Sequence, residues 1–388
     1  MEKLKNIPSL RFPEFNENWE LKTLGEVGEI VTGLTYSPKD ISSDGVLVLR
    51  SSNVKDRLIK LKDNVFVKTT NFNKVINNDI LICVRNGSKN LIGKNALITK
   101  NQEGLAFGAF MIIYRSKLNS FIFQLFDTQK YYKIIKENLG ATINSINNSD
   151  LRKFEFLFPS LQEQTKIASF LTAVDDKLQA LKQKKTLLEQ YKKGVMQKIF
   201  SQELRFKDDN GNDYPDWEEK KLVEICDIKK GKQLNKEELT DSGEYPCING
   251  GINISGFTDK FNTLENTITI SEGGNSCGYI NFFDVKFWSG GHNYSVEINN
   301  IEEINNIFLF QILKFNEVEI MKLRVGSGLP NIQKKDLAAF LLFIPKSINE
   351  QTKIANFLFA IDDKINHCHG QIEKTEVWKK GLLQQMFC

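Results

Sequence analysis

Two stretches of the chain, residues 163–200 and 350–387, carry a regular apolar pattern. Apolar residues recur in steps of four and three, which predicts two long amphipathic helices with one apolar stripe each. At about 40 residues and 1.5 Å per residue, each helix would reach roughly 60 Å. The stripe positions are Ile167, Leu171, Val174, Leu178 and Leu181 in the first run, and Ile354, Leu358, Ile361, Ile365 and Cys368 in the second.

These two runs are also copies of each other. They match at 18 of 38 positions without a gap. Further echoes extend the repeat toward both ends: Leu204-Arg205-Phe206 repeats Leu10-Arg11-Phe12, Trp217 repeats Trp19, and Phe308-Leu309-Phe310-Gln311 repeats Phe121-Ile122-Phe123-Gln124. We therefore expect two copies of one unit of roughly 190 residues, related by an approximate two-fold axis and offering two similar surfaces.

The apolar stripes allow two packing arrangements. The helices can pack on each other as a coiled coil, which would be antiparallel if a two-fold axis relates the repeats. Alternatively, each stripe packs on its own globular domain. We predict the coiled coil and keep packing on the globule as the alternative.

Ahead of each long helix lies a segment of mixed character. Short β-type runs at 46–49, 79–84 and 267–270 are bounded by Gly, Asn, Asp and Ser, and aromatic-rich stretches at 120–138 and 305–323 predict helices. Pro159 and Pro345 close the two segments. The predicted fold is α+β, with mixed α/β globules at 1–158 and 204–344 and long helices at 159–203 and 345–388.

Composition adds few constraints. The net charge is +4, and 41% of the residues are hydrophobic, as in ordinary folded proteins. The sequence shows no signal-peptide pattern and no apolar run long enough to span a membrane, so we expect a cytoplasmic protein. The six cysteines form no CxxC pair, which argues against a zinc ribbon. His367-Cys368-His369 would diverge on a helix, so we expect no metal site.

Catalytic motifs are missing from the sequence: it has no GxGxxG after a strand, no HExxH and no GxSxG. Residues 87–95 resemble a phosphate-binding loop but have one spacer too many, and we interpret them as a tight loop between strands. We expect no cofactor. Trp217, within an acidic run, is interpreted as structural, and the pairs Asp175-Asp176 and Asp362-Asp363 as solvated or partner-facing charges.

Amide, hydroxyl and cationic side chains on Gly-rich loops are the groups that read base edges and phosphates. Loops of this composition occur in both globules. The candidate DNA-binding residues are Arg50, Ser51, Asn53, Arg85, Asn86, Lys89 and Lys94 in the first globule, and Lys229, Lys232, Asn249, Asn253, Asn275, Asn293, Tyr294, Lys322 and Arg324 in the second.

The motif EQTKIA leading to FL, two residues, Val or Ile and DDK, followed by an aromatic-KKG near the helix end, occurs twice behind two divergent globules. Over essentially the full chain this arrangement resembles the specificity subunit of a type I restriction-modification enzyme. The resemblance implies that each globule is a target-recognition domain for one half of a split double-stranded DNA target. It also implies that the two helices form an antiparallel coiled coil that sets the spacing and docks two modification (methyltransferase) subunits.

Methylation and ATP-driven cleavage would belong to the modification and restriction/translocase subunits, with no membrane partner. The helices are thus expected to act in spacing and docking through 163–177 and 350–364 and the stripe residues named above. Two other readings remain: a DNA adenine methyltransferase with fused recognition domains, which needs an NPPF- or DPPY-like motif that the chain lacks, and a coiled-coil scaffold that does not bind DNA.

The expected spacing role gives a first test. Inserting one heptad between Lys177 and Leu188 should lengthen the unread gap of the target, because helix length would set the distance between the two readers. Mapping methylated adenines in a host carrying the altered gene would measure the gap. An unchanged gap would contradict the prediction.

Overall fold

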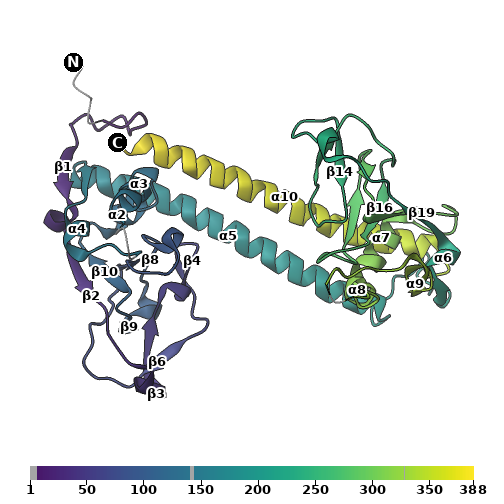
Figure 1. Ribbon diagram of the computed structural model, residues 1–388, viewed down its shortest axis with the longest axis horizontal. Helices are drawn as coiled ribbons and strands as arrows, with labels where there is room; N and C mark the ends of the chain where they lie inside the picture. The colour runs from purple at the N-terminus through teal and green to yellow at the C-terminus, as the bar shows by residue number, and fades with distance from the viewer. Residues whose placement is uncertain (1–6, 140–143, 327) are drawn as a thin grey trace. The chain divides into compact units, whose positions relative to one another are not determined.

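The computed structural model describes residues 7–139, 144–326 and 328–388. They form two compact units, one comprising Met1–Leu181 with Gly370–Cys388 and the other Lys182–His369. Each unit holds one globule, a segment of the long helix that follows it and a segment of the other long helix (Figure 1). The division between the two compact units therefore falls within both long helices.

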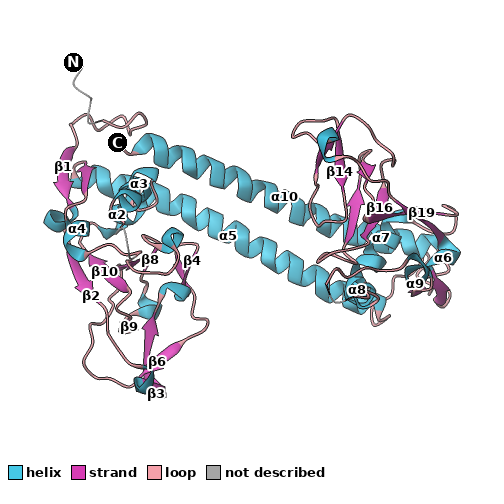
Figure 2. Ribbon diagram, in the orientation of Figure 1, coloured by secondary structure: helices cyan, strands magenta, loops and turns pink. Residues whose placement is uncertain are grey.

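The first globule is built from small sheets and short helices (Figure 2). Its elements are β1 (Glu20–Thr23), α1 (Leu24–Val27), β2 (Glu29–Thr32), β3 (Ile41–Leu49), β4 (Val54–Lys55), β5 (Leu58–Ile59), β6 (Val65–Val67), β7 (Ile80–Cys83), β8 (Asn95–Leu97), β9 (Ala106–Phe107), β10 (Met111–Arg115), α2 (Asn119–Leu125), α3 (Gln129–Glu137), α4 (Asn148–Arg152) and β11 (Glu155–Phe158).

The second globule repeats this plan. Its elements are β12 (Glu218–Lys221), α6 (Leu222–Ile225), β13 (Cys226–Lys230), β14 (Tyr245–Ile248), β15 (Gly256–Thr258), β16 (Thr267–Ser271), β17 (Ile280–Phe283), β18 (Trp288–Ser289), β19 (Asn293–Ile298), α7 (Asn306–Phe315), α8 (Glu317–Lys322), α9 (Lys334–Ala338) and β20 (Leu341–Ile344). The long helices are α5 (Leu161–Phe200) and α10 (Ile348–Met386).

Three sheets have the same topology in both globules, while the described residues form the pair β4-β5 in the first globule alone. The antiparallel order β2-β10-β7-β8 corresponds to β13-β19-β16-β17, and the pair β1-β11 corresponds to β12-β20. A three-stranded sheet accompanies each, β6-β3-β9 and β15-β14-β18, whose central strand has one antiparallel and one parallel neighbour. The middles of the two repeats, which share little sequence, thus form the same three sheets apart from this pair.

The three predicted β runs are confirmed as β3, β7 and β16. Each aromatic-rich stretch predicted as one helix is instead two, α2 with α3 and α7 with α8. Thr128 starts α3 as an N-cap that accepts a hydrogen bond from the Tyr131 amide at 3.3 Å. Asn316 separates α7 from α8 and donates from its side chain to the Ile312 carbonyl at 2.9 Å. Local hydrogen bonding by these short polar side chains competes with helix continuation.

Both long helices and their buried apolar stripes are confirmed. Ile167, Leu171 and Val174 lie in one core cluster with helix α2 of their own globule and also with Leu382 and Met386 of α10. In the second unit Ile354, Leu358 and Ile361 pack likewise on their globule and on Met196 and Ile199 of α5. The start of one helix thus lies beside the end of the other in each unit, which makes the pairing antiparallel. The predicted coiled coil and the alternative packing on the globule occur together.

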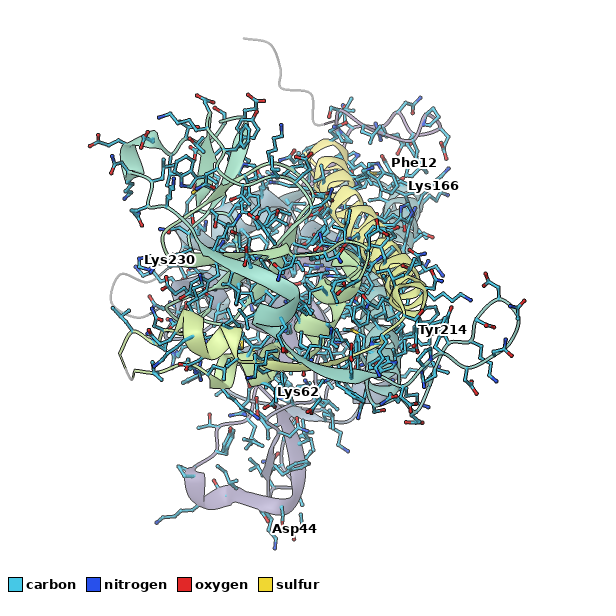
Figure 3. The ribbon with its side chains drawn as sticks, turned by 90° about the vertical axis from the view of Figure 1, so that its right-hand side faces the viewer. Phe12, Asp44, Lys62, Lys166, Tyr214 and Lys230 are labelled. Carbon is cyan, nitrogen blue, oxygen red and sulfur yellow. The ribbon has the colours of Figure 1, made fainter. Side chains whose placement is uncertain are left out.

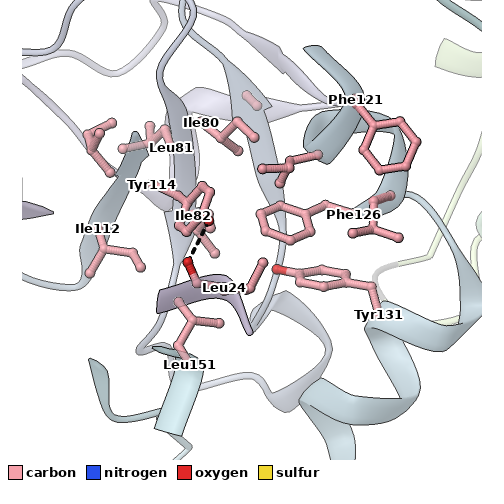
Figure 4. Packing of buried hydrophobic residues seen from close by; sticks show 14 of the residues in the cluster. Leu24, Ile80, Leu81, Ile82, Ile112, Tyr114, Phe121, Phe126, Tyr131 and Leu151 are labelled. Carbon is pink, nitrogen blue, oxygen red and sulfur yellow. Dashed lines mark hydrogen bonds between the residues drawn. The ribbon is translucent and has the colours of Figure 1, made fainter. Parts of the chain in front are cut away.

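The globule cores are continuous with this helix packing. In the first unit the buried strands β7 and β10 contribute Ile80, Ile82 and Ile112, and Tyr114 donates a hydrogen bond to the Leu24 carbonyl at 2.7 Å (Figure 4). Burial raises the pKa of Tyr114, so its phenol stays protonated and remains a donor. The core therefore ties α1 to the sheet.

A buried glutamate begins the packed part of each long helix. Glu163 accepts two hydrogen bonds from Arg11 at 2.7 Å, and its repeat counterpart Glu350 accepts from Arg205 and from the Trp217 indole at 3.1 Å. These contacts attach the segment ahead of each globule to the helix behind it. The structural role predicted for Trp217 is confirmed.

The interpretation of Asp175 and Asp362 as solvated or partner-facing charges is wrong. Both carboxylates accept hydrogen bonds from a glutamine of the globule and a lysine of the other long helix. Their neighbours Asp176 and Asp363 are exposed.

Residues 87–95 form the expected loop between β7 and β8. None of the helices in the described ranges contains an apolar stretch of the length that a lipid bilayer requires.

The two buried tryptophans give a matched test of these contacts. Replacing Trp217 with Phe removes a hydrogen bond to a buried carboxylate, whereas the Trp19 indole nitrogen has no partner in the described part of the chain. We expect Trp217→Phe to lower the free energy of unfolding by about 1–2 kcal/mol more than Trp19→Phe. Urea unfolding of the two full-length variants measures the difference, and equal losses would contradict it.

Candidate nucleic-acid interface

In each globule two loop segments pass each other with their backbones in contact, and this contact is called the crossing. In the first globule it lies where residues 33–34 meet residues 107–108. The Leu34 amide donates to the Phe107 carbonyl at 2.7 Å, and Gly108 donates to the Leu49 carbonyl at 3.0 Å. A Cβ on Gly33 would lie 2.3 Å from the Gly108 oxygen, so only glycine fits there. The crossing joins the end of β2 to the end of β3.

The second globule has the same crossing. The Lys232 backbone amide donates to the Ser289 carbonyl at 2.9 Å, and the Gly290 backbone amide donates to the Ile248 carbonyl at 2.8 Å. Gly231 is as tightly placed as Gly33, because a Cβ would come within 2.1 Å of the Gly290 oxygen. Leu49 therefore corresponds to Ile248, and the residues that follow, Arg50 and Asn249, occupy equivalent positions.

Around the first crossing the structure brings together most of the predicted residues of that globule. The Ser51 hydroxyl accepts a hydrogen bond from Asn86 at 3.0 Å, and its carbonyl accepts one from Lys94 at 3.3 Å. The Arg85 guanidinium lies over the ring of Phe110, 5.6 Å from its centroid. Lys89 is exposed in the same loop between β7 and β8. Two loops with cationic and amide groups thus meet at one place.

Arg50 borders a hollow of about 540 Å³ beside this cluster. Tyr36, Ser51 and the exposed ring of Phe110 also line it. The Arg50 guanidinium donates to the Asp63 carbonyl at 2.5 Å, while its Nε atom has no partner within the described residues. The hollow combines an arginine with aromatic faces, a combination suited to stacking and hydrogen bonding with bases.

The hairpin arm that carries Asp44 belongs to the same globule. Strands β3 and β6 project from the rest of the globule, with Asp44 at the tip and Lys62 closer to its base (Figure 3). Asn53 holds the base of the arm: its side chain donates to the carbonyls of Lys60 and Lys62, both at 3.1 Å, and accepts from the Arg50 amide. Asn53 is fully buried, so its role is to shape the Arg50 loop.

In the second globule the loop after β14 is held by two serines. Ser271 and Ser276 donate from their hydroxyls to the Gly250 carbonyl at 2.5 and 2.6 Å. This fixes the loop that carries Asn249 and Asn253, of which Asn253 is exposed. The His292 backbone amide donates to the Asn249 side-chain oxygen at 3.4 Å. Lys232 is exposed at the same crossing.

The other predicted residues of the second globule have varied positions. Asn275 is exposed on a turn that follows Gly273. Asn331 pairs with both Gly273 and Val325, so the segment after Arg324 lies next to this turn. Lys229 and Lys322 form exposed ion pairs with Glu297 and Glu319. These two lysines belong to β13 and α8 and not to the crossing loops.

Asn293 and Tyr294 are buried in β19. Asn293 donates to the Ser289 hydroxyl at 3.0 Å, and the Tyr294 hydroxyl donates to Glu272 and the Ile332 carbonyl at 3.1 Å. Burial, reinforced by the Glu272 carboxylate, raises the pKa of Tyr294. The carboxylate of Glu272 also pairs with Lys230, labelled in Figure 3. With Asn53, these two residues shape the loops from within.

Sequence reasoning missed the aromatic side chain of Phe110 at the first crossing, whereas His292 at the second belongs to the predicted run Gly291-His292-Asn293-Tyr294. Phe110 and His292 are equivalent, since the carbonyl of each accepts the amide that follows β7 or β16. Both are exposed. A signal was present, because each follows a glycine-containing turn ahead of a strand, where a side chain points away from the core. Tyr36, which lines the hollow, had no comparable signal.

The stripe residues of the long helices are packed inside the chain. Ile167, Leu171, Val174 and Leu178 are buried, as are Ile354, Leu358, Ile361 and Cys368, while Leu181 and Ile365 are partly buried. Their predicted coiled-coil role agrees with this packing. Their predicted role in docking a partner remains a prediction, for which the exposed faces of the same helices offer the available surface.

Comparison with known proteins finds a matching family and several similar chains. The family described as type I restriction modification DNA specificity domain matches residues 16–190 and 214–376. A Mycoplasma genitalium protein described as a putative type I specificity subunit is 35% identical over 45% of this chain and 46% of its own length. The chain thus spans about half the length of that relative.

Longer matches are less similar in sequence. The specificity subunit of the type I restriction enzyme MjaVIII from Methanocaldococcus jannaschii is 24% identical over 98% of this chain and 94% of that protein. A crystal structure of a type I restriction-modification S subunit from M. genitalium superposes with a TM-score of 0.72 at 22% identity, covering 98% of this chain and 99% of that chain. The fold is therefore shared, and the chain belongs to the type I restriction modification DNA specificity domain family.

Proposed function

We propose that this chain is the DNA-specificity subunit of a type I restriction-modification complex. Each globule reads one half of a bipartite, asymmetric DNA target, and the long helices set the spacing and dock two methyltransferase subunits. Catalysis, including any restriction and translocation, belongs to partner subunits. The observation that carries the proposal is one crossing, built twice with the same backbone contacts and different exposed side chains.

The difference between the two crossings supports reading of two different half-sites. Arg50 in the first globule corresponds to Asn249 in the second, and Phe110 corresponds to His292. Arginine pairs well with the O6 and N7 acceptors of guanine, and asparagine with N6 and N7 of adenine. A common frame with changed contact residues is what reading of unlike sequences requires. A fused methyltransferase would need a target-base motif, which the sequence lacks.

Docking of two identical partners is supported by exposed residues that the repeats share. The pairs Asp176/Asp363, Lys177/Lys364, Lys193/Lys380 and Gln197/Gln384 are identical and exposed in both copies. Packing within the chain does not require exposed residues to match. Two equal surfaces on one chain suit two copies of one partner.

The assignment of base readers predicts independent changes in the two halves of the target. Arg50→Ala should relax one base position of one half-site, with a loss of about 1–3 kcal/mol in discrimination, and leave the other half unchanged. Asn249→Ala should do the converse. Single-molecule sequencing of methylated adenines, in cells that also carry the methyltransferase subunit, measures both motifs.

Lys60→Ala, an exposed change directly after β5, provides the control. Two reader variants that leave the motif intact, or one variant that alters both halves, would contradict the assignment. Salt dependence should remain similar, because neither residue is assigned to phosphates.

The docking surface predicts a stepwise loss of partners. Lys177→Glu should reduce binding of one methyltransferase subunit by roughly tenfold, and Lys177→Glu with Lys364→Glu should reduce both, because a reversed rim charge meets like charge. Native mass spectrometry gives the stoichiometry. Lys184→Glu serves as the control, since Lys184 is exposed on α5 and its repeat counterpart is Gln371. Unchanged 1:2 assembly in the double variant would rule out this surface.

A further inference from the structure

One aspartate in each unit joins three elements at a single point. Asp175 on α5 accepts from Gln124 of helix α2 at 3.0 Å and from Lys379 of α10 at 2.6 Å. Asp362 on α10 accepts from Gln311 of helix α7 and from Lys192 of α5, both at 2.7 Å. Each carboxylate is thus held by its globule and by the opposing long helix.

These contacts are largely withdrawn from water. The Lys379 and Lys192 side chains are 11% and 14% exposed, and both aspartate side chains are 25% exposed. A charge in such a place costs free energy unless an opposite charge faces it. The pairs therefore discriminate between arrangements of the helices much more sharply than leucine and isoleucine contacts do.

The two clusters are repeat counterparts. Gln124 and Gln311, Asp175 and Asp362, and Lys192 and Lys379 are matched by the same offset that relates the two long-helix runs. The step along α5 from Asp175 to Lys192 therefore equals the step along α10 from Asp362 to Lys379. The equal spacing means that one antiparallel alignment of the helices satisfies both pairs.

A heptad slip preserves the apolar stripe but not these pairs. If α10 moved by one heptad in one direction, Asp362 would face Ile199 and Asp175 would face Met386. In the other direction Asp362 would meet Lys185, but Asp175 would face Ile372. Either slip therefore leaves at least one carboxylate facing an apolar residue, whereas the observed alignment pairs both.

We propose that Lys192, Asp362 and Gln311, with their counterparts Lys379, Asp175 and Gln124, are positioning residues that select the register of α5 against α10. A single polar position commonly specifies register in coiled coils at some cost in stability. The inference rests on the proposed function, in which this register determines the number of unread bases between the half-sites.

The first cluster is more extensive than the second. Lys379 also contacts Asp127 at 2.6 Å, and Asp127 lies 3.5 Å from Arg57 on the turn between β4 and β5. The counterpart of Asp127 is Lys314, which pairs with Glu317 and packs on the Tyr279 ring. Substitutions in the second unit therefore change the register contact without disturbing the β4-β5 turn of the first globule, which carries Arg57.

The second cluster also permits a charge exchange. The Gln311 side-chain oxygen is buried and has no partner within the described residues. If lysine replaced Asp362, rotation of the Gln311 amide would present this oxygen as an acceptor. Lys192→Glu combined with Asp362→Lys therefore rebuilds the three-way contact with reversed charges.

The experiment compares Lys192→Glu, Asp362→Lys and the double exchange in the full-length chain, assembled with its methyltransferase subunit. Adenine methylation is mapped across the genome by single-molecule sequencing. Each single change should lower methylation at the wild-type gap by roughly tenfold or add targets with a different gap, since like charges then face each other. The double exchange should restore the wild-type gap to within about twofold.

The control exchanges Lys133 and Glu137, an exposed ion pair within α3, and should leave the gap unchanged. Single variants that fail to fold support the proposal if the double exchange recovers methylation at the wild-type gap. Single variants with wild-type methylation at one gap, or a double exchange no better than the singles, would overturn it. Absence of any bipartite motif with the wild-type gene would instead refute the proposed function.

Discussion

Burial of the apolar stripe on each long helix is the constraint on which the rest of the structure depends. A helix of this length is marginal by itself, and its stripe must be covered. In each unit the stripe lies between the globule that precedes it in the chain and the end of the other long helix. The start of each long helix therefore packs both on its own globule and, antiparallel, on the end of the other long helix.

In this arrangement the polar contacts determine the alignment of the helices, and the apolar contacts determine stability. Apolar contacts supply most of the stability but tolerate shifts by a heptad. The buried glutamates Glu163 and Glu350 attach the segment ahead of each globule, and the aspartate contacts join globule, helix and opposing helix. Because a misplaced charge is costly, the few polar residues select one alignment among several that the stripe would permit.

The loops of each globule vary on a backbone frame that does not. Gly33 and Gly231 permit the same close crossing, and the strand orders are the same, although the sequences between the anchors differ. Exposed side chains of these loops, such as those of Lys89 and Asn253, lie outside the core and can change with little loss of stability. One backbone frame can therefore carry two different sets of exposed loop residues.

The sequence by itself determined the duplication, the two long helices with their stripes, the α+β class and the family, because helical periodicity and repeated motifs are local properties. Only the tertiary structure decided that each stripe contacts two partners, that Asp175 and Asp362 are paired and not solvated, and that Asn53, Asn293 and Tyr294 lie inside. It also decided the equivalence of Arg50 with Asn249. Burial and pairing depend on which distant segments meet, and a polar residue in a loop has the same local pattern whether it faces water or supports the loop from within.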